Sequence, residues 1–156
     1  MLVRQEMMSR DPRHGRDKSE NDRHDTSWEN AVRCGCIEEL QRLLDAGSDI
    51  DARDRRGQTA LMWAAKEDRG QLVEWLIQHG ACMNHTAKFG LSAVMLAVVR
   101  GHIDVVRKLT NAGANLDLKG TGPPGFASRS ALDLAVARGD AEIVEILTAG
   151  LKRRHP

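Results

Sequence analysis

Three cysteines and six histidines are the side chains best suited to metal or redox chemistry in this chain. Cys34 and Cys36 are separated by Gly35 alone, whereas Cys82 lies much further along the chain. Structural zinc sites commonly use two such close pairs, and here a second pair at zinc spacing is missing. We therefore interpret the cysteines as small apolar fillers around a turn rather than as metal ligands.

The other candidate groupings also favour structural roles. His79 and His85 flank the predicted end of one helix, and His102 stands at the predicted start of another. The segment GTGPPG at 120–125 resembles a phosphate-binding loop only loosely, because it lacks the lysine of a P-loop and follows no strand. The acidic side chains form no convergent pair. We predict no enzyme, no catalytic residues, no metal site and no cofactor, with a minor enzyme or metal role as the weakest alternative.

The elements that carry these residues recur along the chain. Residues 54–86 return as residues 87–119, a step of 33 residues, and Thr59 aligns with Ser92. Self-similarity at this period is typical of stacked repeats, in which each unit packs only against its neighbours. We predict an all-α fold, a solenoid of helix–turn–helix pairs joined by β-hairpin-like loops.

The two regular copies contain start and stop signals for short helices. Thr59 and Ser92 are suited to cap the first helix of each copy, and apolar residues at helical spacing mark the second. Asp68 stands between the helices where the other copies have glycine, so we expect it to adopt a positive φ with modest strain. The four predicted helices cover residues 60–67, 70–78, 93–100 and 103–111.

The outer copies depart from this pattern. In the first copy, Thr26 and Glu29 have the spacing of a capping box that would start a helix at Ser27. The fourth copy has five extra residues in its connecting hairpin, which reads GTGPPGFASR and places Phe126 near a loop tip. Such insertions often lie on the binding face, but a neutral loop with Phe126 folded back on the stack is the favoured alternative.

The domain organisation follows from these boundaries. Residues 1–25 lack a periodic apolar pattern after Met8, so they cannot offset their ordering entropy; a solvated tail is favoured over a short partner-binding segment. We predict a disordered arm over 1–25, a repeat domain over 26–150 divided into 26–53, 54–86, 87–119 and 120–150, and a basic tail over 151–156.

Two recurring strings resemble a known family. G-x-T-A-L-M-x-A-A at 57–65 and R-G-H-I-D-V-V at 100–106, each with counterparts in register, are similar to the ankyrin repeat. The resemblance covers about residues 26–150, which implies four ankyrin repeats. The family's histidine is replaced by Met62, Met95 and Asp133, and this replacement removes a polar tie between repeats.

The resemblance implies a non-catalytic module that binds a protein partner through its hairpin tips and the concave face of the first helices. In this chain those positions are Arg55, Arg56, Gln58, Met62, Lys66, Lys88, Phe89, Leu91, Met95, Val99 and Arg100, with Phe126 as an added contact. An apolar strip with a basic rim would suit a partner with an apolar anchor and acidic flanks. In the alternative, the two methionines pack between repeats and the arginines are ordinary solvated charges.

Charge and cysteine content limit the partners and the location. The chain of 156 residues carries 23 Lys and Arg against 22 Asp and Glu, a net charge of +1. This balance gives no reason to expect nucleic acid or a membrane as partner. An odd number of cysteines without a visible secretory signal favours a cytoplasmic location. We predict a monomeric scaffold, adaptor or inhibitor; the alternative is a regulator that caps the surface of one enzyme.

Overall fold

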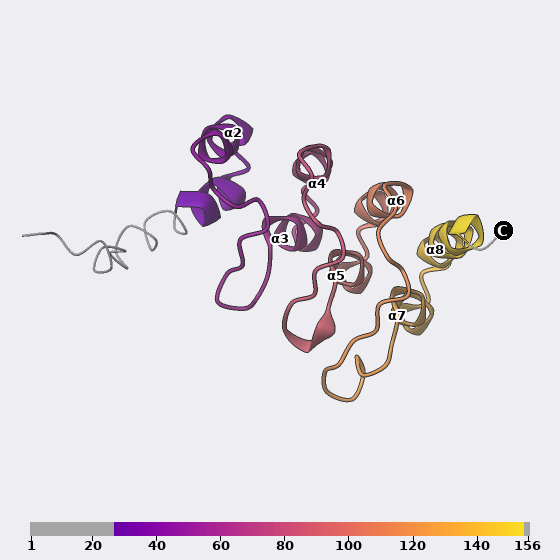
Figure 1. The fold of residues 1–156 in the computed structure, drawn as a ribbon. Coiled ribbons are helices and arrows are strands. Elements are labelled where there is room, and N and C mark those ends of the chain that lie inside the picture. Colours follow the sequence, from indigo (N-terminus) through magenta and orange to yellow (C-terminus); the bar gives the residue numbers. More distant parts are fainter. Residues whose placement is uncertain (1–26, 155–156) are drawn as a thin grey trace, which may run out of the picture.

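The computed structural model describes residues 27–154, and Figure 1 shows them as a row of stacked helix pairs. The first helices of the pairs form one layer and the second helices form the other, with long loops projecting beyond the first layer. In chain order, the elements are a helix over 27–34, α2 (Ile37–Asp45), α3 (Ala60–Lys66), α4 (Gly70–Gln78), the 3-10 turn η1 (Lys88–Gly90), α5 (Ala93–Arg100), α6 (Ile103–Asn111), α7 (Ala131–Arg138) and α8 (Ala141–Arg154). Within 27–154, extended pairing is limited to an isolated antiparallel bridge between Thr86 and Ser92.

The predicted caps begin the first helices. The hydroxyl oxygens of Thr59 and Ser92 accept the backbone N–H of the residue three positions later, each at 3.4 Å. Ser130 does the same at 3.3 Å for Asp133, whose carboxylate accepts the Ser130 backbone N–H in return. These bonds satisfy amide groups that a helix start leaves without partners. Thr26, the proposed first cap, lies outside the described residues.

The turn inside each helix pair has the predicted geometry. Gly101 and Gly139 end α5 and α7 in the left-handed region, with φ values of 77° and 78°. Asp68 occupies the equivalent turn after α3 with a φ of 57°, so a non-glycine residue adopts the conformation there. Asp accepts this region at lower cost than most side chains, and the prediction for Asp68 is confirmed.

The core is a continuous layer of aliphatic side chains between neighbouring helices. α3 packs against α5 and α5 against α7, while α4 packs against α6 and α6 against α8. Leu76, Val98 and Leu109 are fully buried at these contacts. Each such side chain contributes on the order of 1.5–3 kcal/mol by leaving water. Small residues such as Ala64 and Ala97, both fully buried, allow the close approach.

The C-terminal boundary differs from the prediction. α8 continues to Arg154, so residues 151–154 form its last turn rather than a separate tail. The Arg153 guanidinium donates to the Asn111 side chain at 3.2 Å, and Arg154 donates to the carbonyls of Gly113 and Ala114. These bonds to the end of α6 hold the basic residues on the stack.

The remaining boundaries concern the ends of the described chain. The predicted arm over 1–25 and residues 155–156 lie outside the described residues. Between residues 27 and 154, none of the helices combines the length and the apolar character needed to cross a membrane.

Candidate functional site

The tips of neighbouring loops are hydrogen-bonded to one another. The Lys88 backbone N–H donates to the Arg56 carbonyl at 3.4 Å, and the Thr121 N–H donates to the Phe89 carbonyl at 2.8 Å. Three successive loops are thereby linked along the edge of the stack, where Figure 1 shows them projecting side by side. This arrangement brings residues from three repeats onto one surface.

Asp54 shapes the first of these tips. Its carboxylate accepts the backbone N–H groups of Arg56 and Gln58, both at 2.8 Å, and its own N–H donates to the Gln58 carbonyl at 2.9 Å. A short polar side chain that bonds its own following backbone is a common way to close a turn. Arg55 and Arg56 are consequently held at the exposed end of the loop.

The second tip pairs a cation with an aromatic ring. Lys88 is exposed, and its Nζ lies 5.5 Å from the centre of the Phe89 ring, within cation–π range. Phe89 is 46% exposed, which is high for a large apolar side chain. We call the four residues Arg55, Arg56, Lys88 and Phe89 the tip surface. It combines three positive charges with one accessible aromatic ring.

The inserted loop of the fourth repeat supports Phe89. Phe89 has a φ of 67°, an unusual value for a bulky residue and one that its surroundings must stabilise. Gly122 lies directly against it, because a Cβ atom on Gly122 would stand 2.6 Å from the Phe89 Cβ. Phe126 is half-buried and packs on the core, as the folded-back alternative predicts. The insertion therefore positions Phe89 rather than presenting Phe126 at an exposed tip.

The predicted apolar strip is wrong for the two methionines. Met62 and Met95 are each 1% exposed and belong to the core. α3 packs against α5 and α5 against α7, so the burial of both methionines agrees with the alternative in which they pack between repeats. Leu91 and Val99 are half-buried and also pack against the core. The apolar residues predicted to contact a partner all lie within residues 27–154. Among them, Phe89 is the one whose side chain is substantially exposed.

The remaining predicted contacts lie apart from the tip surface or serve the fold. The Lys66 side chain is partly exposed, 3.6 Å from the Glu67 carboxylate, and its backbone carbonyl lies 2.9 Å from Nε2 of His102. Arg100 is exposed at the end of α5. Gln58 is half-buried, and its backbone closes the loop at Asp54. Lys66, Arg100 and Gln58 therefore remain separate candidate contact residues outside the tip surface.

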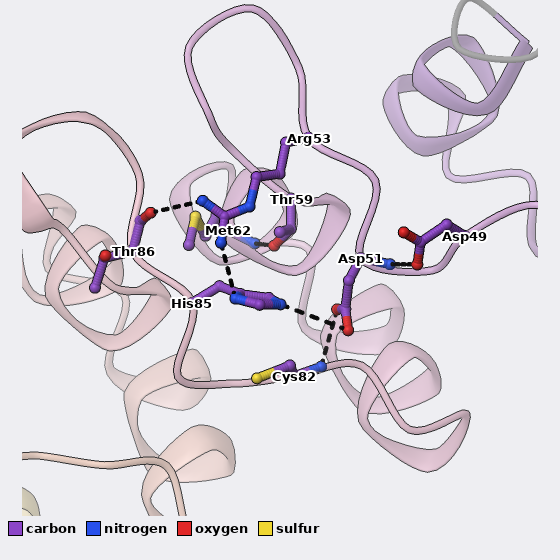
Figure 2. A network of polar contacts seen from close by, with 8 residues as sticks. All are labelled: Asp49, Asp51, Arg53, Thr59, Met62, Cys82, His85 and Thr86. Carbon is purple, nitrogen blue, oxygen red and sulfur yellow. Dashed lines mark hydrogen bonds and ion pairs between the residues drawn. The ribbon is translucent and has the colours of Figure 1, made fainter. Parts of the chain in front are cut away.

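A polar network ties consecutive repeats together behind the tips (Figure 2). The Asp51 carboxylate accepts the Cys82 backbone N–H at 2.9 Å and lies 3.7 Å from the His85 ring. The other ring nitrogen of His85 lies 2.9 Å from the Arg53 guanidinium, which also reaches the Thr86 carbonyl at 3.4 Å. His85 thus has a structural position, as predicted, although its partners could not be named before the fold was known.

A small open pocket lies between the first helix layer and the loop before α3. Its apolar walls include Trp28, Val32 and Trp63, with Asp54 and Gln58 at the loop side. Trp28 is 4% exposed, and its indole N–H has no hydrogen-bond partner in the described part of the chain. Sequence reasoning missed this pocket because its walls come from two repeats, although two tryptophans in a chain poor in aromatics are a visible signal.

The interpretation of the cysteines as apolar fillers is wrong for the close pair. Cys34 and Cys36 are both exposed, and a disulfide joins them. They lie at the two ends of the turn between helices, outside the packed faces. Cys82 is a free, half-buried thiol. Among residues 27–154, no group of three or more His, Cys, Asp or Glu side chains is arranged to hold a metal ion.

The comparisons with known proteins concern the same repeated region. A family model described as Ankyrin repeats (3 copies) matches residues 28–120. The B-cell lymphoma 3 protein homolog of Mus musculus is 35% identical over 119 residues, which cover 74% of this chain and 27% of that protein. Ankyrin repeat domain-containing protein 63 of Homo sapiens is 32% identical over 94 residues, 58% of this chain and 25% of that protein. A putative ankyrin repeat-containing protein of Treponema pallidum is 32% identical over 114 residues, 72% of this chain and 37% of that protein.

These relatives are considerably longer than the matched region. The chain spans 27%, 25% and 37% of their lengths, respectively. In this chain, the residues that match the family model, 28–120, lie within the repeat stack. Repeats of this kind are generally protein–protein interaction modules and generally non-catalytic. Both the matched family model and the stacked helix pairs place this chain in the ankyrin repeat family.

Proposed function

We propose that this domain is a non-catalytic module that binds a protein partner through the tip surface. The observation that carries the proposal is the hydrogen-bonded row of loop tips. The Arg56 carbonyl accepts the Lys88 N–H, and the Lys88 cation lies 5.5 Å from the half-exposed ring of Phe89. An aromatic residue at the centre of a charged rim is a common arrangement at binding hot spots. The surface suits a partner with an apolar site flanked by carboxylates.

Preorganisation supports this choice of surface. The Phe89 carbonyl is bonded to Thr121, and Gly122 packs against its Cβ, so the ring is presented by a supported backbone. The ordering of side chains and loops is a large part of the free-energy cost of binding. A loop that is already held in place loses less conformational freedom when a partner arrives.

The test separates the aromatic contribution from the charge contribution. Proteins retained on immobilised wild-type chain are identified by mass spectrometry, and the candidate is then titrated directly by calorimetry against purified variants. We expect Phe89→Ala to weaken binding by at least 2 kcal/mol, as hot-spot residues do. Arg55→Glu combined with Arg56→Glu should weaken binding and reduce its dependence on salt.

A charge-matched control tests whether the location matters. Arg42→Glu combined with Lys152→Glu changes the net charge equally, at exposed positions on α2 and α8 in the second helix layer. We expect this control to bind nearly as wild type does. Equal losses in the control and in the Arg55 and Arg56 variant would contradict the tip surface, as would unchanged affinity in Phe89→Ala.

A regulator of one enzyme would use the same surface. Adding the domain to its purified partner and assaying that partner's activity distinguishes this role from a scaffold. The monomeric state and the cytoplasmic location stay predictions. Light scattering on the purified chain checks the first, and imaging of the tagged protein checks the second.

A further inference from the structure

The disulfide between Cys34 and Cys36 lies in a turn that brings the two residues together without help from the rest of the fold. Gly35 has a φ of 74°, and its N–H donates to the Ala31 carbonyl at 2.9 Å, which ends the helix over 27–34. The Cys36 N–H donates to the same carbonyl at 3.2 Å. The two cysteine Cα atoms are consequently 5.3 Å apart, within the usual span of a disulfide.

This bond is poorly suited to stabilise the fold. A disulfide acts mainly by restricting the unfolded chain, and the restriction grows with the length of the loop that it closes. Here the two cysteines are two positions apart, so the closed loop is about as short as the chain permits. Both side chains are exposed and lie outside the hydrophobic core. An exposed, short-loop disulfide is accessible to reagents and can open without disturbing the packing.

The local environment favours a reactive thiolate after reduction. Cys36 is the N-cap residue of α2, next to the backbone N–H groups of the first helical turn. No side chain forms a capping hydrogen bond at this helix start. The Arg69 guanidinium from the next repeat lies beside the turn, 3.7 Å from where a Cβ on Gly35 would be. Helix starts and nearby cations both stabilise thiolates, against the opposing charges of Glu38 and Glu39 in the same turn.

We propose that Cys34 and Cys36 form a thiol–disulfide exchange site for low-molecular-weight disulfides such as glutathione disulfide. The Cys36 thiolate attacks one sulfur of the small disulfide, whose S–S bond breaks to release one thiolate, which takes up a proton. Cys34 then loses its proton and attacks the Cys36 sulfur, which expels the second small thiol. Two protein thiols are oxidised to one disulfide while the small disulfide is reduced to two thiols, and the reverse sequence restores them.

The chain provides its own internal control for the test. Trypsin cleavage after Arg33 and Arg42 yields peptide 34–42, which contains both cysteines of the pair, whereas Cys82 falls in peptide 70–88. The full chain is equilibrated in buffers of varied glutathione to glutathione disulfide ratio, quenched with acid, alkylated and digested. We expect peptide 34–42 to lose two hydrogen atoms and carry no alkyl group in oxidising buffers, and to carry two alkyl groups in reducing ones. Peptide 70–88 holds a single thiol, Cys82, so it should carry either an alkyl group or glutathione and never an internal disulfide.

Three outcomes would overturn the proposal. Peptide 34–42 could remain doubly alkylated across all ratios, it could carry glutathione without an internal bond, or Cys82 could be oxidised to the same extent. The proposal does not depend on the proposed protein-binding function, because partner binding is not part of this measurement.

Variants identify the attacking cysteine. In Cys34→Ser, we expect Cys36 to form its mixed disulfide with glutathione about tenfold faster than Cys82 does in the same molecule. Adding Arg69→Gln should slow this reaction severalfold, whereas Arg129→Gln, an exposed control in the fourth repeat, should leave the rate unchanged. Circular dichroism confirms that each variant is folded. Equal rates at Cys36 and Cys82 would overturn the proposal.

Discussion

The third and fourth repeats carry a valine at the same position of their first helix, with opposite surroundings. Val98 in α5 is fully buried, whereas Val136 in α7 is 61% exposed. The second helices differ in the same sense, since Val106 is fully buried and Val144 is half-buried. The difference arises because α7 and α8 cover α5 and α6, while no further described helix covers α7 and α8.

The comparison shows that each repeat is built to be packed on both sides. Its helices carry apolar residues toward the preceding and the following repeat, as a stacked architecture requires. The fourth repeat keeps this pattern on its outer side, although the described structure ends there. Whether an apolar residue is buried therefore depends on the neighbouring repeat and not on its own repeat sequence.

The largest expected effect comes from placing a charge at the two valines. Val98→Asp buries an unpaired carboxylate in the core and should lower the free energy of unfolding by more than about 4 kcal/mol. Val136→Asp places the same group in solvent and should change it by no more than about 0.5 kcal/mol. Urea denaturation followed by circular dichroism measures both. Similar losses at the two sites would mean that the outer side of α7 is covered in solution.

A smaller effect is expected where the two repeats meet at the inserted loop. Gly122→Ala forces a Cβ against the Cβ of Phe89, so the loop must shift, at a cost of about 1–3 kcal/mol. Thr121→Ala is the matched control, because it keeps the backbone N–H that donates to the Phe89 carbonyl. Chemical denaturation gives the stabilities, and an unaffected Gly122→Ala variant would contradict a supporting role for the insertion.

The smallest expected effect is a pH-dependent difference in stability between the helix caps of the third and fourth repeats. The cap of α7 includes the titrating side chain of Asp133, whereas the equivalent position of α5 is Met95. Hydrogen bonds from the backbone N–H and then the hydroxyl of Ser130 lower the pKa of Asp133 below its usual 3.8, and the nearby charges of Lys119 and Arg129 act in the same direction. A lowered folded-state pKa means that the carboxylate stabilises the fold above the unfolded pKa, and that this contribution is lost as pH falls through the folded one.

The measurement for Asp133 is the difference in unfolding free energy between wild type and Asp133→Asn as a function of pH. We expect a small stabilisation of the wild type near neutral pH that disappears below pH 3.8 as Asp133 becomes protonated. Met95 occupies the equivalent position of α5 and has no titrating group, so Met95→Leu should give a difference that is independent of pH. A pH-independent difference for Asp133→Asn would exclude the ionised capping box.

Local signals were enough to predict much of the stack. The bounds predicted for α4, α5 and α6 agree with the structure, and α3 ends one residue earlier than predicted. Thr59 and Ser92 cap their helices as their hydroxyl groups and positions indicate. These features depend on contacts within a few residues, so a single repeat contains the information that specifies them.

The candidate site was less accessible to prediction. Arg55, Arg56 and Lys88 were correctly placed at exposed loop tips, because turn residues with charged side chains remain in solvent. The sequence left open whether Met62 and Met95 face a partner or pack between repeats. The structure buries both, with α3 packed against α5 and α5 against α7. The pocket beside Trp28 also depends on packing between repeats, because its walls come from separate repeats.

The amino-acid sequence by itself determined the repeat period, the helix starts and turns, and the family, because each follows from residue types at short spacing. The tertiary structure alone decided which apolar residues are covered, how the inserted loop supports Phe89, and that the Cys34 and Cys36 pair faces solvent. Burial and support of this kind are properties of contacts between segments far apart in the chain. They are defined only once the repeats have stacked.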